Sequence, residues 1–109
     1  MQLPLQITFR HMDPSPAVES AIRKHAERLD RFSDRVTSCR VVVEAPHKHQ
    51  RKGRLYDIRI DLTVPGEELP VTRTGPRDHA REDIYVAIRD AFDTVTRVLE
   101  DHTRRARGV

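Results

Sequence analysis

The chain has 109 residues, of which 37% are hydrophobic and 34% are charged. This length suits one domain, so we expect a single domain over 1–109. The formal net charge of +3 permits a polyanionic partner without identifying one. The single cysteine, Cys39, excludes an internal disulfide and a thiolate metal cage. We expect it to be a small buried residue in a strand.

Two further classes of interaction are disfavoured by composition. The N-terminus lacks the apolar run of a signal peptide, and no stretch approaches the roughly 20 apolar residues that span a bilayer. We therefore expect a cytoplasmic protein with no membrane partner. Tryptophan is absent, and there are 2 Tyr and 3 Phe. Any contact with nucleic acid should then rest on charge and shape more than on aromatic stacking.

The first half of the chain predicts a strand, a helix and a second strand. Apolar and polar residues alternate over 5–9. A helix is expected over about 16–32, because Ser15 can cap its amides and Pro16 suits its first position. Its apolar stripe comprises Val18, Ile22, Ala26, Leu29 and Phe32. The second strand is expected over 36–45, with Cys39, Val41 and Val43 on one face.

The second half predicts two more strands and a long helix. Strict alternation over 56–64 requires one buried and one wet face, which predicts an antiparallel sheet with a single covered face. A turn at Pro65-Gly66 leads to a short strand over 69–74, where Pro70 indicates an edge position or a strand end. A helix is expected over about 83–105. The apolar face of this helix comprises Ile84, Ile88, Ala91, Val95, Val98 and Leu99.

The order β-α-β-β-β-α predicts an α+β fold. We expect a two-layer sandwich in which two helices pack on one face of a four-stranded sheet.

Basic residues are sorted along both expected helices. At about 100° per residue, Lys24, Arg28 and Arg31 fall on one flank of the first helix, and His25 lies closer to its apolar stripe. This sorting suits a phosphate-binding edge, although a solvated face that keeps the protein in solution explains it as well. On the second helix, a comparable flank carries both cations and acids: Arg97, Arg104, Arg105, Asp90 and Asp101. The tail over about 104–109 is basic, which also complements the helix dipole.

The expected loop over 46–54 is the densest positive run in the chain. Its cations Lys48, Arg51 and Lys52 can reach phosphates, and an ordinary solvated hairpin loop is the alternative. His47 and His49 are spaced to share a metal ion, but no third ligand lies near them in sequence.

Motifs for catalysis are not found. Asp57 and Asp61 flank Arg59 on the wet face of one strand, which favours a cross-strand salt ladder over an acid–base pair. Gly-rich phosphate loops and nucleophile elbows are absent from the sequence. We expect no catalytic residue, metal, cofactor or small-molecule substrate.

Three segments carry a resemblance to a known family. The run Asp83-Ile84-Tyr85-Val86-Ala87-Ile88-Arg89 resembles the opening of the last helix in the ribosome hibernation-promoting factors, a family that includes the ribosome-associated translation inhibitors. Leu5-Gln6-Ile7-Thr8 looks like the first strand of that family, and Ser15-Pro16-Ala17-Val18 looks like the start of its first helix. The resemblance covers about residues 3–105, and the order of elements matches.

The resemblance implies a function and a surface. Family members bind the small ribosomal subunit between its head and body, where they block messenger and transfer RNAs, so the implied partner is 16S-type ribosomal RNA. By position, His25, Arg28, Arg97 and Arg105 match basic family residues, whereas Thr94 and Asp101 stand where lysine is common. The chain resembles the short form, which lacks a dimerising module. The full set of expected RNA-binding residues is Lys24, His25, Arg28, Arg31, Lys48, Arg51, Lys52, Arg89, Arg97 and Arg105.

Two other functions remain open from the sequence. A ribosome-independent module for double-stranded RNA would use the 46–54 loop to grip a free RNA helix. A small metal-dependent hydrolase would use His47 and His49.

Overall fold

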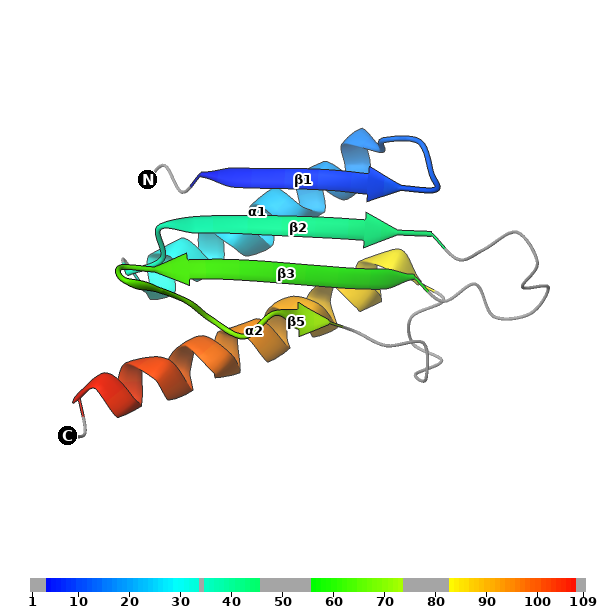
Figure 1. Ribbon diagram of the computed structural model, residues 1–109. Helices are drawn as coiled ribbons and strands as arrows, with labels where there is room; N and C mark the ends of the chain where they lie inside the picture. Colours follow the sequence, from blue (N-terminus) through cyan, green and yellow to red (C-terminus); the bar gives the residue numbers. More distant parts are fainter. Residues whose placement is uncertain (1–3, 34, 46–55, 74–82, 108–109) are drawn as a thin grey trace.

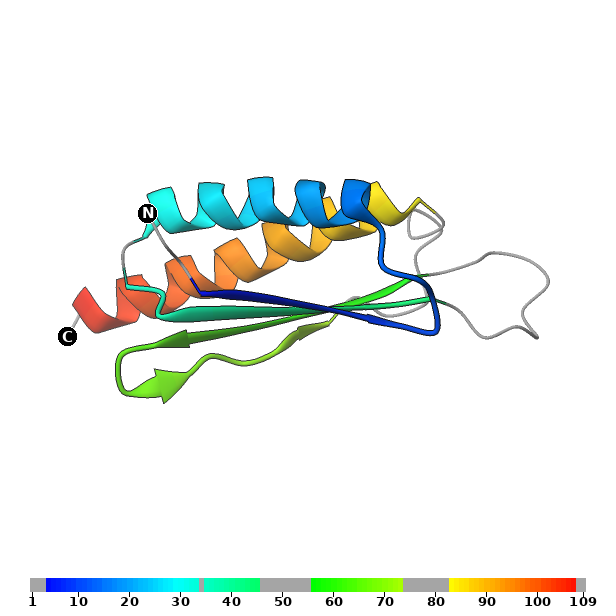
Figure 2. The ribbon, with the colours of Figure 1, turned by 90° about the horizontal axis from the view of Figure 1, so that it is seen from above.

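A computed structural model of the chain describes residues 4–33, 35–45, 56–73 and 83–107. It contains one sheet with two helices packed on one of its faces (Figure 1), and Figure 2 shows the two layers edge-on. The elements are β1 (Leu5–Arg10), α1 (Pro16–Phe32), β2 (Ser38–Glu44), β3 (Asp57–Val64), β4 (Glu67–Glu68), β5 (Thr72–Arg73) and α2 (Ile84–Arg107). The predicted element order and two-layer α+β architecture are confirmed.

The sheet is mixed, and the expectation that it is wholly antiparallel is wrong. β1 pairs with β2 in parallel, with Leu5 opposite Cys39, whereas β2 and β3 are antiparallel, with Val41 opposite Ile60. The helix α1 carries the chain back to the end of the sheet at which β1 began, and a strand–helix–strand unit of this kind is parallel. Alternation on β3 predicts a covered face, but it carries no information on the direction of β1.

The short strand predicted over 69–74 forms as two pieces, β4 and β5, and both pair antiparallel with β3. Pro70 lies between them and has no amide hydrogen for the ladder. The amide of Leu69 still donates to the carbonyl of Leu62 at 3.0 Å. The two pieces together therefore fill one strand position beside β3. Gly66 adopts a φ of 84° in the preceding turn, a conformation that glycine takes without strain.

The core lies between the sheet and the two helices. The inward side chains of β2 and β3 are almost fully buried: Cys39, Val41, Val43, Ile58, Ile60, Leu62 and Val64. The α2 face is wider than predicted, because Ala87 and Phe92 are also buried, whereas Ile84 and Val98 are only partly buried. Phe32 departs from its predicted stripe. It is the last residue of α1, and its side chain is 50% exposed.

Cys39 behaves as predicted. It is a free cysteine buried in β2, and burial raises the pKa of its thiol to about 12, with the charge of Asp61 acting in the same direction. Neither helix in the described ranges has the length and apolar character that crossing a membrane requires.

Replacing Ser15 by alanine should destabilise the fold through α1. The hydroxyl of Ser15 accepts a hydrogen bond from the Val18 amide at 3.3 Å, which caps the helix as predicted. Loss of such a cap costs about 0.5–2 kcal/mol, so the midpoint of urea unfolding should fall. Ser20→Ala, at a position within the same helix, is the control and should leave the midpoint unchanged or raise it slightly. Equal midpoints for Ser15→Ala and wild type would show that the cap contributes nothing.

Candidate functional site

An open groove separates the two helices on the outer side of the molecule. The helices lie side by side and run in the same direction along the sheet (Figures 1 and 2). The groove has a volume of about 350 Å³. From α1 it is lined by His25, Arg28, Leu29 and Phe32. From α2 it is lined by Phe92, Asp93, Thr96 and Arg97. We call this feature the interhelix groove.

The inner part of the interhelix groove is an aromatic stack. The imidazole of His25 lies on the ring of Phe92, with centroids 5.2 Å apart and planes 14° from parallel. Burial lowers the pKa of His25, Arg28 and Arg89 lower it further, and only Asp93 acts against them. The sequence left the charge of His25 conditional on pH. The lowered pKa favours the uncharged imidazole at pH 7, so His25 contributes a flat ring to the groove more than a positive charge.

The rim of the groove carries two arginines that are available to an external anion. Arg28 and Arg97 come from different helices, and both side chains are exposed. Within the described residues, neither forms an ion pair with an acidic side chain. Lys24 and Arg31 are exposed beside Arg28 on α1 and are likewise unpaired there. The predicted basic flank of α1 is therefore present, and Arg97 joins it across the groove.

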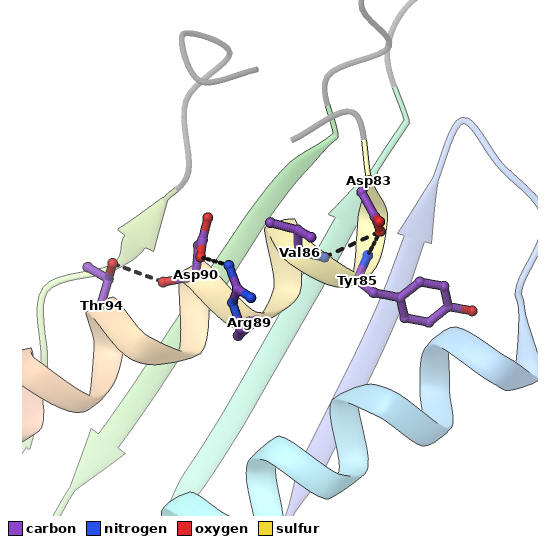
Figure 3. Close-up of polar contacts among 6 residues, drawn as sticks. All are labelled: Asp83, Tyr85, Val86, Arg89, Asp90 and Thr94. Carbon is purple, nitrogen blue, oxygen red and sulfur yellow. Dashed lines mark hydrogen bonds and ion pairs between the residues drawn. The ribbon is translucent and has the colours of Figure 1, made fainter. Parts of the chain in front are cut away.

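At the start of α2, unlike at the rim of the groove, the charged side chains have partners within the protein (Figure 3). The carboxylate of Asp83 accepts hydrogen bonds from the amides of Tyr85 and Val86, at 2.9 and 3.4 Å, and so caps the helix. The guanidinium of Arg89 lies 3.2 Å from the carboxylate of Asp90. This ion pair partly satisfies Arg89, so its contact with RNA stays a prediction with weaker support than that of Arg97.

The cations near the end of α2 do not extend the groove. Arg105 lines a separate pocket of about 670 Å³, together with Glu67, Glu68 and His102. The guanidinium of Arg104 lies 3.5 Å from the carboxylate of Asp101. Helical spacing predicted that Arg97, Arg104 and Arg105 share one flank of the second helix. In the structure, Arg97 lines the interhelix groove, whereas Arg104 and Arg105 do not. A helical wheel gives angles about one axis but does not show which side of the helix the sheet occupies.

Three groove residues were missed from the sequence. Phe92, Asp93 and Thr96 were not predicted as site residues, because the predicted site on the second helix consisted of cations alone. Asp93 could have been predicted, because it lies four residues from both Arg89 and Arg97, and residues four apart share one face of a helix.

Several predicted residues lie outside the described part of the chain. These are the loop cations Lys48, Arg51 and Lys52, and the histidines His47 and His49. The duplex-RNA and hydrolase alternatives depended on these residues, so both stay predictions from the sequence. Among the described residues, no group of three or more His, Cys, Asp or Glu side chains is placed to hold a metal ion.

The cross-strand salt ladder predicted for β3 is present at one of its two acidic residues. Asp57 forms an ion pair of 2.9 Å with Arg73 on β5. Asp61 forms no ion pair within the described residues.

Comparison with known proteins agrees on one family. Residues 5–107 match the family described as sigma 54 modulation protein / S30EA ribosomal protein. The chain is 28% identical over 102 residues to the ribosome hibernation promotion factor of Deinococcus radiodurans, covering 92% of this chain but 49% of that protein. It is 29% identical over 106 residues to the ribosome hibernation promoting factor of Acinetobacter guillouiae, covering 92% of this chain and 88% of that protein. The chain therefore spans about half the length of the Deinococcus relative.

Solved structures share the fold. A ribosomal subunit interface protein from Coxiella burnetii superposes with a TM-score of 0.70 at 15% identity, over 93% of this chain and 98% of that one. The N-terminal domain of Thermus thermophilus Protein Y superposes with a TM-score of 0.57 at 20% identity, over 90% of this chain and 96% of that one.

Proposed function

Since the chain belongs to the sigma 54 modulation protein / S30EA ribosomal protein family, we propose that it binds the small ribosomal subunit in the channel used by messenger and transfer RNAs. Bound there, it inhibits translation and holds ribosomes in hibernation. Its partner is 16S-type ribosomal RNA, and it acts in the cytoplasm as a single ribosome-binding domain. The family membership supports a binding protein that carries out no reaction, as two of its relatives are named ribosome hibernation factors.

One observation carries the proposal: Arg28 and Arg97 face a common groove from two helices and have no acidic partner within the described residues. Arginines with no internal ion pair can displace counterions from RNA phosphates, and this displacement gives an affinity that falls with salt. Both helices are anchored through almost fully buried residues, such as Ile22 and Val95. The anchored core holds the two arginines in a fixed relation, which suits a ribosomal surface of fixed shape.

The mechanism requires no covalent step. The domain occupies space that initiating RNAs need, so inhibition depends on its concentration and on competition with those RNAs. The domain binds phosphates and recognises the shape of the RNA.

Sedimentation with separated ribosomal subunits tests the proposal. We expect the wild-type chain to migrate through sucrose gradients with small subunits and not with large subunits, and to leave them as salt is raised. Excess messenger and initiator transfer RNA should displace it, because they compete for the same channel. Equal migration with both subunits, or binding that those RNAs do not disturb, would contradict the proposal.

A further inference from the structure

Phosphate binding gives no role to the exposed ring in the interhelix groove. Phe32 lines the groove beside Arg28 and Arg97, and half of its side-chain surface is open to solvent. His25, which stacks on the buried ring of Phe92, lies in the same groove and adds its partly exposed imidazole as a second flat surface. Flat aromatic surfaces next to unpaired arginines are the combination on which proteins stack the bases of single-stranded nucleic acid.

We propose that the interhelix groove receives one unpaired RNA base, which stacks on Phe32 while Arg28 and Arg97 bind phosphates of the same strand. This inference rests on the proposed function and names the part of the RNA that the groove takes. The groove volume of about 350 Å³ falls within the range of about 300–1,000 Å³ that is typical of small-ligand pockets. A base held in a duplex is stacked between its neighbours and cannot enter, so the groove selects single-stranded RNA.

The groove also offers a hydrogen-bond acceptor to the edge of the base. Asp93 lines it, and within the described residues the carboxylate of Asp93 accepts no hydrogen bond. The hydroxyl of Thr96 already donates to the carbonyl of Phe92 at 2.7 Å, so its proton is in use. An acceptor favours a base with an exocyclic amino group, which uracil lacks. We therefore assign Asp93 a preference for amino-bearing bases over uracil.

A fluorescent base analogue tests stacking directly. The probe is a short oligouridylate with one central 2-aminopurine, whose fluorescence is quenched when it stacks. Wild-type protein should quench the probe, and Phe32→Leu should lose most of the quenching and weaken binding by about fivefold or more. Phe32→Tyr keeps a ring and should restore both. Tyr85→Leu is the matched control, since Tyr85 is 48% exposed but does not line the groove, and it should behave as wild type.

Two further arms separate the contributions. A probe with an abasic site in place of 2-aminopurine should bind wild type about as weakly as the original probe binds Phe32→Leu. Asp93→Asn should reduce the ratio of affinities for the 2-aminopurine strand and a strand of uridine alone. Circular dichroism of each variant verifies that the fold is retained.

The outcomes distinguish this inference from the function on which it rests. An absence of quenching with wild type, equal quenching by Phe32→Leu, or equal binding of the abasic strand overturns the base site. If the chain nevertheless migrates with small subunits, the ribosomal function stands without it. If quenching depends on Phe32 but the chain does not migrate with small subunits, the base site is supported and the ribosomal function is overturned.

Discussion

Replacing Lys24, Arg28 and Arg97 together by alanine is expected to weaken binding to the small ribosomal subunit by roughly 100-fold at physiological salt. Each side chain is exposed and has no acidic partner within the described residues, so each is free to neutralise a phosphate. The logarithmic dependence of affinity on salt should also become shallower, by close to one unit for each phosphate that the variant no longer neutralises. Sedimentation at several salt concentrations measures both quantities.

The fold of this triple variant should be intact, since exposed substitutions change stability by roughly 0.5 kcal/mol or less each. The matched control removes the same charge from the wet face of the sheet, by replacing Arg10, Arg40 and Arg59 with alanine. That variant should bind almost as wild type does. The assigned surface is wrong if the helix variant still migrates with small subunits, and charge alone is responsible if both variants bind equally poorly.

Replacing Ile60 by alanine is expected to lower the free energy of unfolding by about 2–5 kcal/mol. Ile60 has no exposed surface and lies on β3, which pairs with β2 on one side and with β4 and β5 on the other. A small domain has about 5–15 kcal/mol of stability in total, so this loss is a substantial fraction of it. Urea unfolding followed by circular dichroism gives the value.

Val71→Ala serves as the control for this destabilisation. Val71 lies between β4 and β5, and its side chain is 48% exposed, so removing the same kind of apolar atoms should change stability by roughly 0.5 kcal/mol or less. A change of under about 1 kcal/mol for Ile60→Ala would mean that the core at β3 relaxes around the cavity.

Most elements of the fold were predictable because burial of one face produces a periodic pattern of apolar residues in the sequence. The alternation on β3 and the three- and four-residue spacing on α1 both follow from one covered face, and the structure confirms each. The parallel pairing of β1 was not predictable in this way, since strand direction depends on the path of the whole chain. The break at Pro70 was anticipated as an edge or an end, but the resumption of pairing at β5 depends on its packing against β3.

The candidate site was predictable in part. The flank of Lys24, Arg28 and Arg31 follows from angles about one helix, and these angles hold within α1. Arg28 and Arg97 line one groove, and this does not follow from the sequence of either helix alone. It requires the two helices to pack side by side in one direction and in one register. The exposure of Phe32 was missed for a similar reason: spacing placed it on the apolar stripe, but the core does not cover the end of the helix.

The stack of His25 on Phe92 joins α1 to α2 in the groove that Arg28 and Arg97 also line. The separation of packed helices, about 8–10 Å between axes, depends on the side chains at their interface. Exchanging either ring for a larger or smaller group would move Arg28 relative to Arg97 without altering a single charge. The distance between the two arginines can therefore be changed by substitutions at buried or partly buried positions, which a map of surface charge alone would not reveal.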